Sequence, residues 1–132
     1  MPLPLSSALT SFPFRMSCRI HLQRSGNYRV VRLEGVDFSP VQQTEFRAAI
    51  QSMLVSSDTT PVAIWTSGLG VVGSCCLAAL IEAAMACHRQ GIAVVIVEDR
   101  AQVLEVFEVV SLHSIVEVQI SLEDLPGEAI SP

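Results

Sequence analysis

The sequence contains no lysine and few aromatic or charged residues. Only 16% of its 132 residues are charged and 5% are aromatic, and 13 acidic against 8 basic residues give a formal net charge of −5. Because phosphate binding needs clustered positive charge, this composition argues against nucleic acid as the main partner. Hydrophobic residues make up 50% of the chain, which is ample for the core of one domain and argues against disorder of the whole chain.

The chain also lacks the cysteine and histidine spacings of disulfide-rich and metal-binding proteins. It has four cysteines, Cys18, Cys75, Cys76 and Cys87, and no Cys-x-x-Cys or His-x-x-x-His pattern. Cys76 and Cys87 would lie about 16 Å apart on one helix, too far for a disulfide. We therefore expect reduced thiols in a cytoplasmic protein, with no metal and no cofactor. We find no Ser/His/Asp set or other catalytic constellation, so we expect no enzymatic activity.

No uninterrupted hydrophobic run reaches the length of a membrane span. The nearest candidate is Leu69–Cys87, which carries one charge, Glu82, deep inside it. A charge at that depth costs about 3 kcal/mol on insertion scales, and Gly70, Gly73 and Ser74 interrupt the first half of the segment. We interpret the segment as a buried helix of a soluble domain, and the protein as not integral to a membrane.

Three regions differ in composition. Residues 1–17 are rich in Pro, Ser and Thr without periodicity, lack the basic start of a signal peptide, and are interpreted as a mobile arm. Met16 is an alternative start of the chain, and the sequence leaves this open. Residues 18–125 have the pattern of one α/β domain, and residues 126–132 are expected to form a C-terminal tail.

The first half of the domain carries strong local signals. Alternating residues in 18–22 and an extended run over 28–35 flank the turn Ser25-Gly26-Asn27, which predicts a β-hairpin. Ser39, Pro40 and Gln42 then form a predicted N-cap, first helical residue and capping box. This helix is expected to end at residues 56–59.

The second half alternates strands and helices. We predict a strand over 61–65, a glycine-punctuated loop over 67–73, and a helix that Ser74 caps and Gly91 terminates. A strand over 92–97, buried on both faces, a helix over 99–110 and a strand over 115–120 follow. The order β-β-α-β-α-β-α-β predicts an α/β fold with a mixed sheet, opened by a hairpin and covered by helices.

The charges are unevenly placed along the chain. Five arginines, from Arg15 to Arg32, precede the first acidic residue, while residues 98–128 hold eight acids and the single Arg100. Two readings stay open. The charges form either two solvated faces of opposite sign or an electrostatically polar surface that orients a partner.

The stretch Pro61–Leu80 resembles the signature of the STAS family, named after anti-sigma-factor antagonists. That signature is an apolar strand, an Asp, a few loop residues and then Asp-Ser-Ser-Gly-Leu at the start of a helix. Here Val62-Ala63-Ile64 matches the strand, and Gly73-Ser74-Cys75-Cys76-Leu77 matches the motif. Segments 33–37, 91–97 and 121–124 resemble the flanking elements, so the resemblance spans residues 18–125.

The departures from the signature concern its regulation. In phosphorylation-controlled members the second serine accepts phosphate, and that position is Cys75 here. The preceding Asp is replaced by Gly73, and the acid that ends the strand is replaced by Trp65. Ser74 matches the first serine, so it is either a phosphorylation site or a plain helix cap. The resemblance thus implies a docking surface without the family's serine switch.

The resemblance implies a non-enzymatic regulatory module in signal transduction and transcription regulation. It would dock a protein partner through the loop 66–77 and the helix start at Gly73, Ser74, Cys75 and Cys76. The implied partner is an anti-sigma factor with a serine-kinase-like fold or a larger sensor assembly, and a homodimer is possible. The alternative within the family is a soluble STAS subunit of a membrane lipid or anion transport system.

Three further readings remain as alternatives. Gly68, Gly70 and Gly73 spell Gly-x-Gly-x-x-Gly between a strand and a helix, with Glu98-Asp99 after the next strand, as in a small nucleotide-binding protein. Cys75 near a helix start is either a redox-active thiol or a small packing residue. Trp65 is either a surface anchor or packs in the core against the long helix.

Overall fold

The computed structural model describes residues 19–121, so the expectations for the arm 1–17, for Cys18, for segment 122–125 and for the tail 126–132 lie outside it. The order of elements agrees with the predicted one, apart from a short 3₁₀ turn before the last strand. The elements are β1 (Arg19–Ser25), β2 (Tyr28–Gly35), α2 (Pro40–Leu54), β3 (Val62–Leu69), α3 (Ser74–Arg89), β4 (Val94–Val97), α4 (Ala101–Val109), η2 (Leu112–Ser114) and β5 (Glu117–Gln119).

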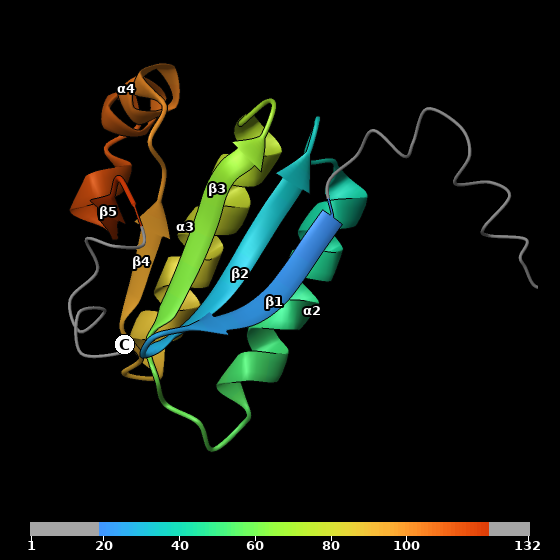
Figure 1. Cartoon of the computed structure of the whole chain (residues 1–132), viewed down its shortest axis with the longest axis vertical. Coiled ribbons are helices and arrows are strands. Elements are labelled where there is room, and N and C mark those ends of the chain that lie inside the picture. Colours follow the sequence, from blue (N-terminus) through green and yellow to red (C-terminus); the bar gives the residue numbers. More distant parts are fainter. Residues whose placement is uncertain (1–18, 122–132) are drawn as a thin grey trace, which may run out of the picture.

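The five strands form one mixed sheet in the order β1-β2-β3-β4-β5. The hairpin strands β1 and β2 are antiparallel, and the β2–β3, β3–β4 and β4–β5 pairs are parallel. The predicted fold class is therefore confirmed. Strands β2, β3 and β4 all end at the same edge of the sheet, and α2, α3 and α4 begin there (Figure 1).

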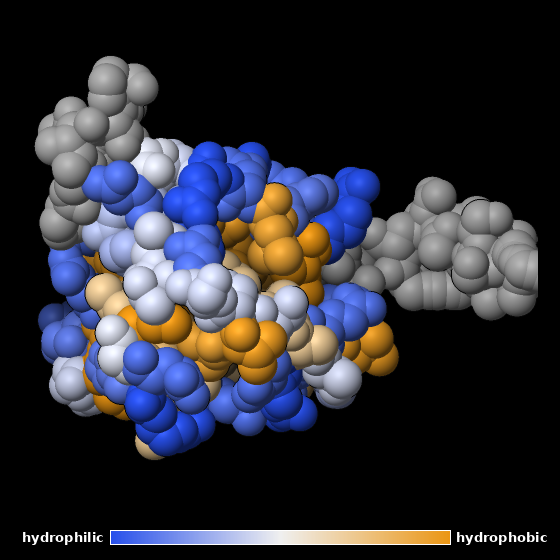
Figure 2. Space-filling view, turned by 90° about the horizontal axis from the view of Figure 1, so that it is seen from below, coloured by the Kyte–Doolittle hydropathy of each residue, from blue (hydrophilic) through white to orange (hydrophobic). Residues whose placement is uncertain are grey.

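The main core lies between the sheet and the helices. Helices α2 and α3 lie behind the sheet (Figure 1), and all three helices contribute buried residues to one cluster that includes Phe46, Leu80 and Phe107. Seen from the end opposite the helix starts, hydrophobic residues form an interrupted band between polar surfaces (Figure 2). The helical cover that the pattern predicted therefore lies on one face of the sheet.

Helix α3 explains the long apolar segment of the sequence. The small side chains of Ala79, Ala83 and Ala84 are buried, and Ala79 and Ala83 line the groove between α3 and α2. Glu82 lies on the exposed side, where its carboxylate meets the guanidinium of Arg47 on α2 at 3.2 Å. Within residues 19–121, no helix is long and apolar enough to cross a membrane.

The capping box at the start of α2 is present as predicted. Pro40 is the first helical residue, and the backbone N–H of Ser39 donates to Oε1 of Gln42 at 3.2 Å. Helix α3 ends as predicted before Gly91, which has φ +73°. This is the left-handed conformation that glycine adopts readily after the end of a helix. Each signal depends only on residues that are neighbours in the sequence, so the sequence alone predicts both.

Strand β3 is longer than predicted. Residues 66–69 were expected in a loop, but the strand continues to Leu69 in parallel register with Glu34 and Gly35 of β2. At Gly68 a Cβ atom would lie 2.8 Å from the carbonyl oxygen of Leu33. This glycine therefore marks the close approach of two strands and not a turn.

Trp65 lies on the face of the sheet opposite the helices, so the prediction that it packs against the long helix was wrong. It is half-buried against a second cluster formed by strand residues alone, namely Tyr28, Val30, Ala63, Val95 and Val97. The guanidinium of Arg32 lies over its ring, 4.5 Å from the centroid. Trp65 and Arg32 are paired neighbours on β3 and β2, which favours this cation–π contact.

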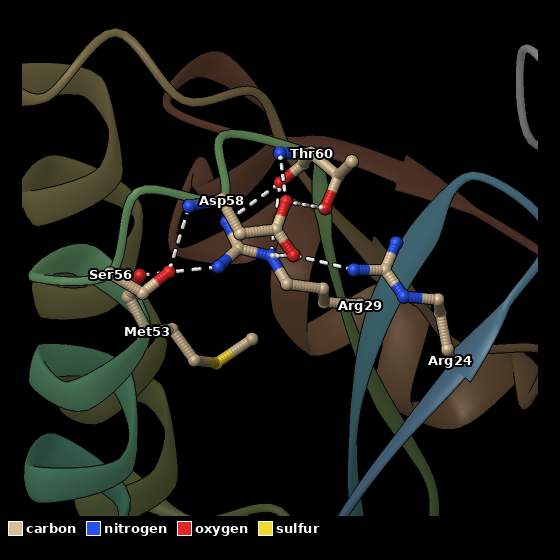
Figure 3. Close-up of polar contacts among 6 residues, drawn as sticks. All are labelled: Arg24, Arg29, Met53, Ser56, Asp58 and Thr60. Carbon is tan, nitrogen blue, oxygen red and sulfur yellow. Dashed lines mark hydrogen bonds and ion pairs between the residues drawn. The ribbon is translucent and has the colours of Figure 1, made fainter.

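A polar network fixes the loop between α2 and β3 (Figure 3). Asp58 accepts hydrogen bonds from the N–H and hydroxyl of Thr60 at 3.0 and 2.7 Å, and from Arg24 of β1 at 2.5 Å. Arg29 donates to the carbonyl oxygens of Met53 and Thr60 at 3.1 and 2.7 Å. The network joins the hairpin to the end of α2.

This network makes the stability of the fold depend on acid pH. The backbone hydrogen bond from Thr60, then its hydroxyl and Arg24, lower the pKa of Asp58 to about 2, below the value of about 3.9 in an unfolded chain. As the pH falls, the unfolded state therefore takes up the proton first, and the contribution of Asp58 is lost between about pH 5 and pH 2.

We predict that Asp58→Asn reduces the loss of stability at acid pH. The urea midpoint of the wild type should fall more between about pH 6 and about pH 3 than that of the variant, because Asn has no proton to gain. Asp99→Asn, at an exposed position outside the network, should keep the wild-type pH dependence. Equal slopes for the wild type and Asp58→Asn would contradict the prediction.

Candidate docking surface at the start of helix α3

The link between β3 and α3 is held against the end of β2. The N–H of Gly70 donates to the carbonyl oxygen of Gly35 and the N–H of Val71 to that of Val36, both at 2.8 Å. These bonds continue the β2–β3 pairing beyond the strands. Only residues 72–73 then remain before the helix, so the start of α3 is fixed relative to the sheet.

The surface around this link is accessible and exposes two valines beside the exposed Asp37. Val36 is 43% exposed and Val71 is 52% exposed, and their backbones are hydrogen-bonded neighbours. Ser74 is exposed and Cys75 half-buried. We call Val36, Val71, Ser74 and Cys75 the tip surface.

The four motif residues differ in what they expose. Gly73 is half-buried and is the N-cap, so the reading of Ser74 as the cap was wrong; Ser74 is the first helical residue. Cys75 packs partly against the main core, whereas Cys76 is fully buried in it. Direct contact with a partner is therefore open to Ser74, to Cys75 and in part to Gly73, while Cys76 supports them from inside.

The start of α3 carries no acidic side chain in its first turn and no side-chain cap. The free N–H groups and partial positive charge of a helix start are therefore not offset by a carboxylate of that turn. This agrees with the loss of the family's Asp at Gly73. The tip surface presents two valines, one hydroxyl and one half-buried thiol in place of an acidic switch.

A buried carboxylate supports the tip from below. Glu98, directly after β4, is fully buried and accepts hydrogen bonds from the hydroxyl of Thr66 at 2.6 Å and from Nε of Arg100 at 2.8 Å. Arg100 also donates to the carbonyl oxygens of Thr66, at 2.9 Å, and of Leu69. The pair therefore ties the end of β4 to the last residues of β3.

The pKa of Glu98 reflects this bonding. Burial acts to raise it, but hydrogen bonds from Arg100 and Thr66 outweigh burial and hold the pKa below its usual value. Glu98 is ionised and fully engaged, so it has no free oxygen for a ribose hydroxyl. Because Gly68 also lies inside β3, the Gly-x-Gly-x-x-Gly string does not form the turn of a dinucleotide site.

Sequence reasoning did not find this network. The signal was a charged pair, Glu98 and Arg100, directly after the four buried residues of β4. A charge at the end of a strand buried on both faces needs a nearby partner. Elsewhere, Cys75, Cys76 and Cys87 form no disulfide with one another, and residues 19–121 contain no group of three His, Cys, Asp or Glu side chains that could hold a metal ion.

Comparison with known proteins agrees with this architecture. The family model described as "Mlab, STAS domain" matches residues 20–117, most of the chain, and the chain belongs to this STAS family. No curated protein sequence matches it significantly.

Solved structures share the fold at low identity. An anti-sigma factor antagonist from Mycobacterium paratuberculosis is similar with a TM-score of 0.68 and 17% identity, over 81% of this chain and 89% of that one. A serine-to-glutamate variant of RsbS from Moorella thermoacetica gives 0.63 and 17%, over 80% and 89%. An anti-sigma-factor antagonist (STAS) domain protein from Planctomyces limnophilus gives 0.61 and 14%, over 80% and 92%.

We predict that Glu98→Gln destabilises the domain by about 1–3 kcal/mol, because charge-assisted hydrogen bonds to Arg100 are lost. Urea unfolding at neutral pH measures this. Glu108→Gln on the exposed side of α4 is the matched control and should stay within about 0.5 kcal/mol of the wild type. If both variants unfold together with the wild type, the network does not hold the tip.

Proposed function

We propose that the chain is a non-enzymatic, cytoplasmic interaction module that docks a protein partner through the tip surface. The observation that carries the proposal is the pair of exposed valines, Val36 and Val71, on a link fixed by backbone hydrogen bonds. Exposed apolar side chains on a rigid support lose little conformational freedom on binding. Membership of the STAS family adds the expectation that the partner is a protein.

The partner proposed first is an anti-sigma factor with a serine-kinase-like fold or a larger sensor assembly. The fold similarity to a protein named as an anti-sigma factor antagonist supports this, as a matter of fold alone. Such a module would act in signal transduction and transcription regulation. The second candidate, a soluble subunit of a membrane lipid or anion transport system, is favoured by the description of the matching family model, which begins with Mlab.

The proposed docking is constitutive with respect to the family's serine switch. Cys75 occupies the phosphoacceptor position and cannot form the serine phosphate, and Gly73 supplies no carboxylate. Ser74 remains the one hydroxyl of the motif, and its exposure leaves it open to modification. A phosphate there would place about two negative charges beside Val71 and weaken an apolar contact.

We predict that Val71→Asp and Ser74→Asp each reduce partner capture at least about tenfold, because a charge enters an apolar contact at its centre. The measurement is quantitative mass spectrometry after affinity purification of each tagged variant from its native host. Val109→Asp is the matched control, since Val109 is 81% exposed on α4, away from the tip surface.

Loss of the same protein from both tip variants, with retention by the control, supports docking through the tip surface. The identity of the captured protein then distinguishes the two candidate partners, because a kinase-like anti-sigma factor and a transporter subunit differ in sequence. Equal capture by the wild type and both tip variants would refute the docking site.

A further inference from the structure

Strand β1 leaves a long edge of the sheet uncovered. Its seven residues pair with β2 on one side, and no other strand within residues 19–121 lies on the other side. All of its residues are exposed except Ile20 and Ser25, which are half-buried. A strand edge of this length presents unpaired peptide groups that can pair with a further strand.

The pairing pattern shows which peptide groups face outward. The N–H of Arg29 donates to the carbonyl oxygen of Pro61 on the β3 side at 2.9 Å. Arg29 therefore does not bond its opposite residue, Arg24. Since bonded and non-bonded pairs alternate along an antiparallel ladder, the peptide groups of Ile20, Leu22 and Arg24 point to the free edge.

Leu22, at the centre of this strand edge, is also its most apolar exposed residue. Leu22 is the midpoint of Arg19–Ser25, and 56% of its surface is exposed. Its side chain lies on the helix side of the sheet, beside a shallow hollow that is lined also by Ile20 and by Glu45 and Ala49 of α2. An exposed leucine at the centre of an open strand edge is the feature that a second strand would cover.

We propose that two copies of the chain pair antiparallel through β1, with the twofold axis at Leu22, to form a continuous ten-stranded sheet. This register pairs all seven residues of both strands. It places Leu22 against the partner subunit's Leu22 and Arg24 against the partner subunit's Ile20. The interface is isologous, as in most homodimers.

The charges on β1 are compatible with this register. Arg19 faces the partner subunit's Ser25, and His21 faces the partner subunit's Gln23, so no two cationic residues stand directly opposite each other. Moving the axis to Arg24 would oppose two guanidinium groups, and moving it to His21 would oppose two imidazoles. Either shift also shortens the ladder, and like charges directly opposite are destabilising.

The rival surface for self-association is α4. Val106 and Val109 on that helix and Val110 at its C-cap are 38%, 81% and 41% exposed. Acidic Glu105 and Glu108 lie on the same helix and would meet their own copies in a twofold contact. In the proposed register no two like charges of β1 stand directly opposite each other.

The first test is sedimentation of the full chain from low micromolar to submillimolar concentration. The wild type should shift from 14.3 kDa toward twice that mass as concentration rises, since an interface of one strand pair is small and weak. Leu22→Arg, which sets two arginines on the axis, should weaken association at least about tenfold. Val109→Arg should associate like the wild type.

The proposal is overturned if the wild type stays monomeric throughout, or if Val109→Arg and not Leu22→Arg abolishes the dimer. Thermal unfolding of Leu22→Arg checks that the variant folds, which its exposed position favours. The outcome does not depend on the docking function, because neither β1 nor α4 belongs to the tip surface.

A second test fixes the register. In a bonded antiparallel pair the two Cα atoms lie about 5.5 Å apart, within reach of a disulfide, so Leu22→Cys oxidised with diamide should form a covalent dimer. Gln23→Cys, whose Cα would lie roughly 8 Å from its copy, should not exceed the wild-type background. Crosslinking of Gln23→Cys but not of Leu22→Cys would overturn the register.

Discussion

The ion pair between Glu98 and Arg100 determines the geometry of the edge where the helices begin. Glu98 is fully buried, and a buried carboxylate is tolerated only when its oxygens are hydrogen-bonded. Arg100 meets that demand and at the same time binds the carbonyl oxygens of Thr66 and Leu69 at the end of β3. The end of β3 and the segment that leads into α4 are therefore joined by one pair of charges.

Backbone contact, more than side-chain identity, preserves the family's architecture here. Gly68 and Gly70 lie where a Cβ would approach the carbonyl oxygens of Leu33 and Val36 at 2.8 and 3.1 Å. Small buried alanines on α3 line its groove with α2. The acidic and hydroxyl groups of the signature are not needed for this packing, so Gly73 and Cys75 can replace them while the fold and an exposed tip remain.

The sequence predicted features whose causes are local and missed those that depend on distant residues. The hairpin turn, the capping box at Ser39 and the helix stop at Gly91 each act within a few residues, and all three are present. Gly68 was interpreted as a loop signal because the strand that crowds it is far away in sequence. The sequence left the face of Trp65 open because a strand buried on both sides has no polar alternation to mark its faces. The Glu98 network also joins residues that are far apart in sequence, Glu98 and Arg100 with Thr66 and Leu69, so the sequence did not reveal it.

In the structure, some of the unevenly distributed charges form ion pairs, and three exposed acidic residues lie near α4 and β5 at the β5 edge of the sheet. Arg24, Arg47 and Arg100 each meet an acidic partner, whereas Glu105, Glu108 and Glu117 lie exposed on or beside α4 and β5. Attraction between this acidic edge and the arginines of β1 would favour a head-to-tail contact of β1 with β5. Strand β5, however, offers only three residues for pairing against seven in β1. The backbone bonding available therefore favours a closed twofold pair over an open chain of subunits.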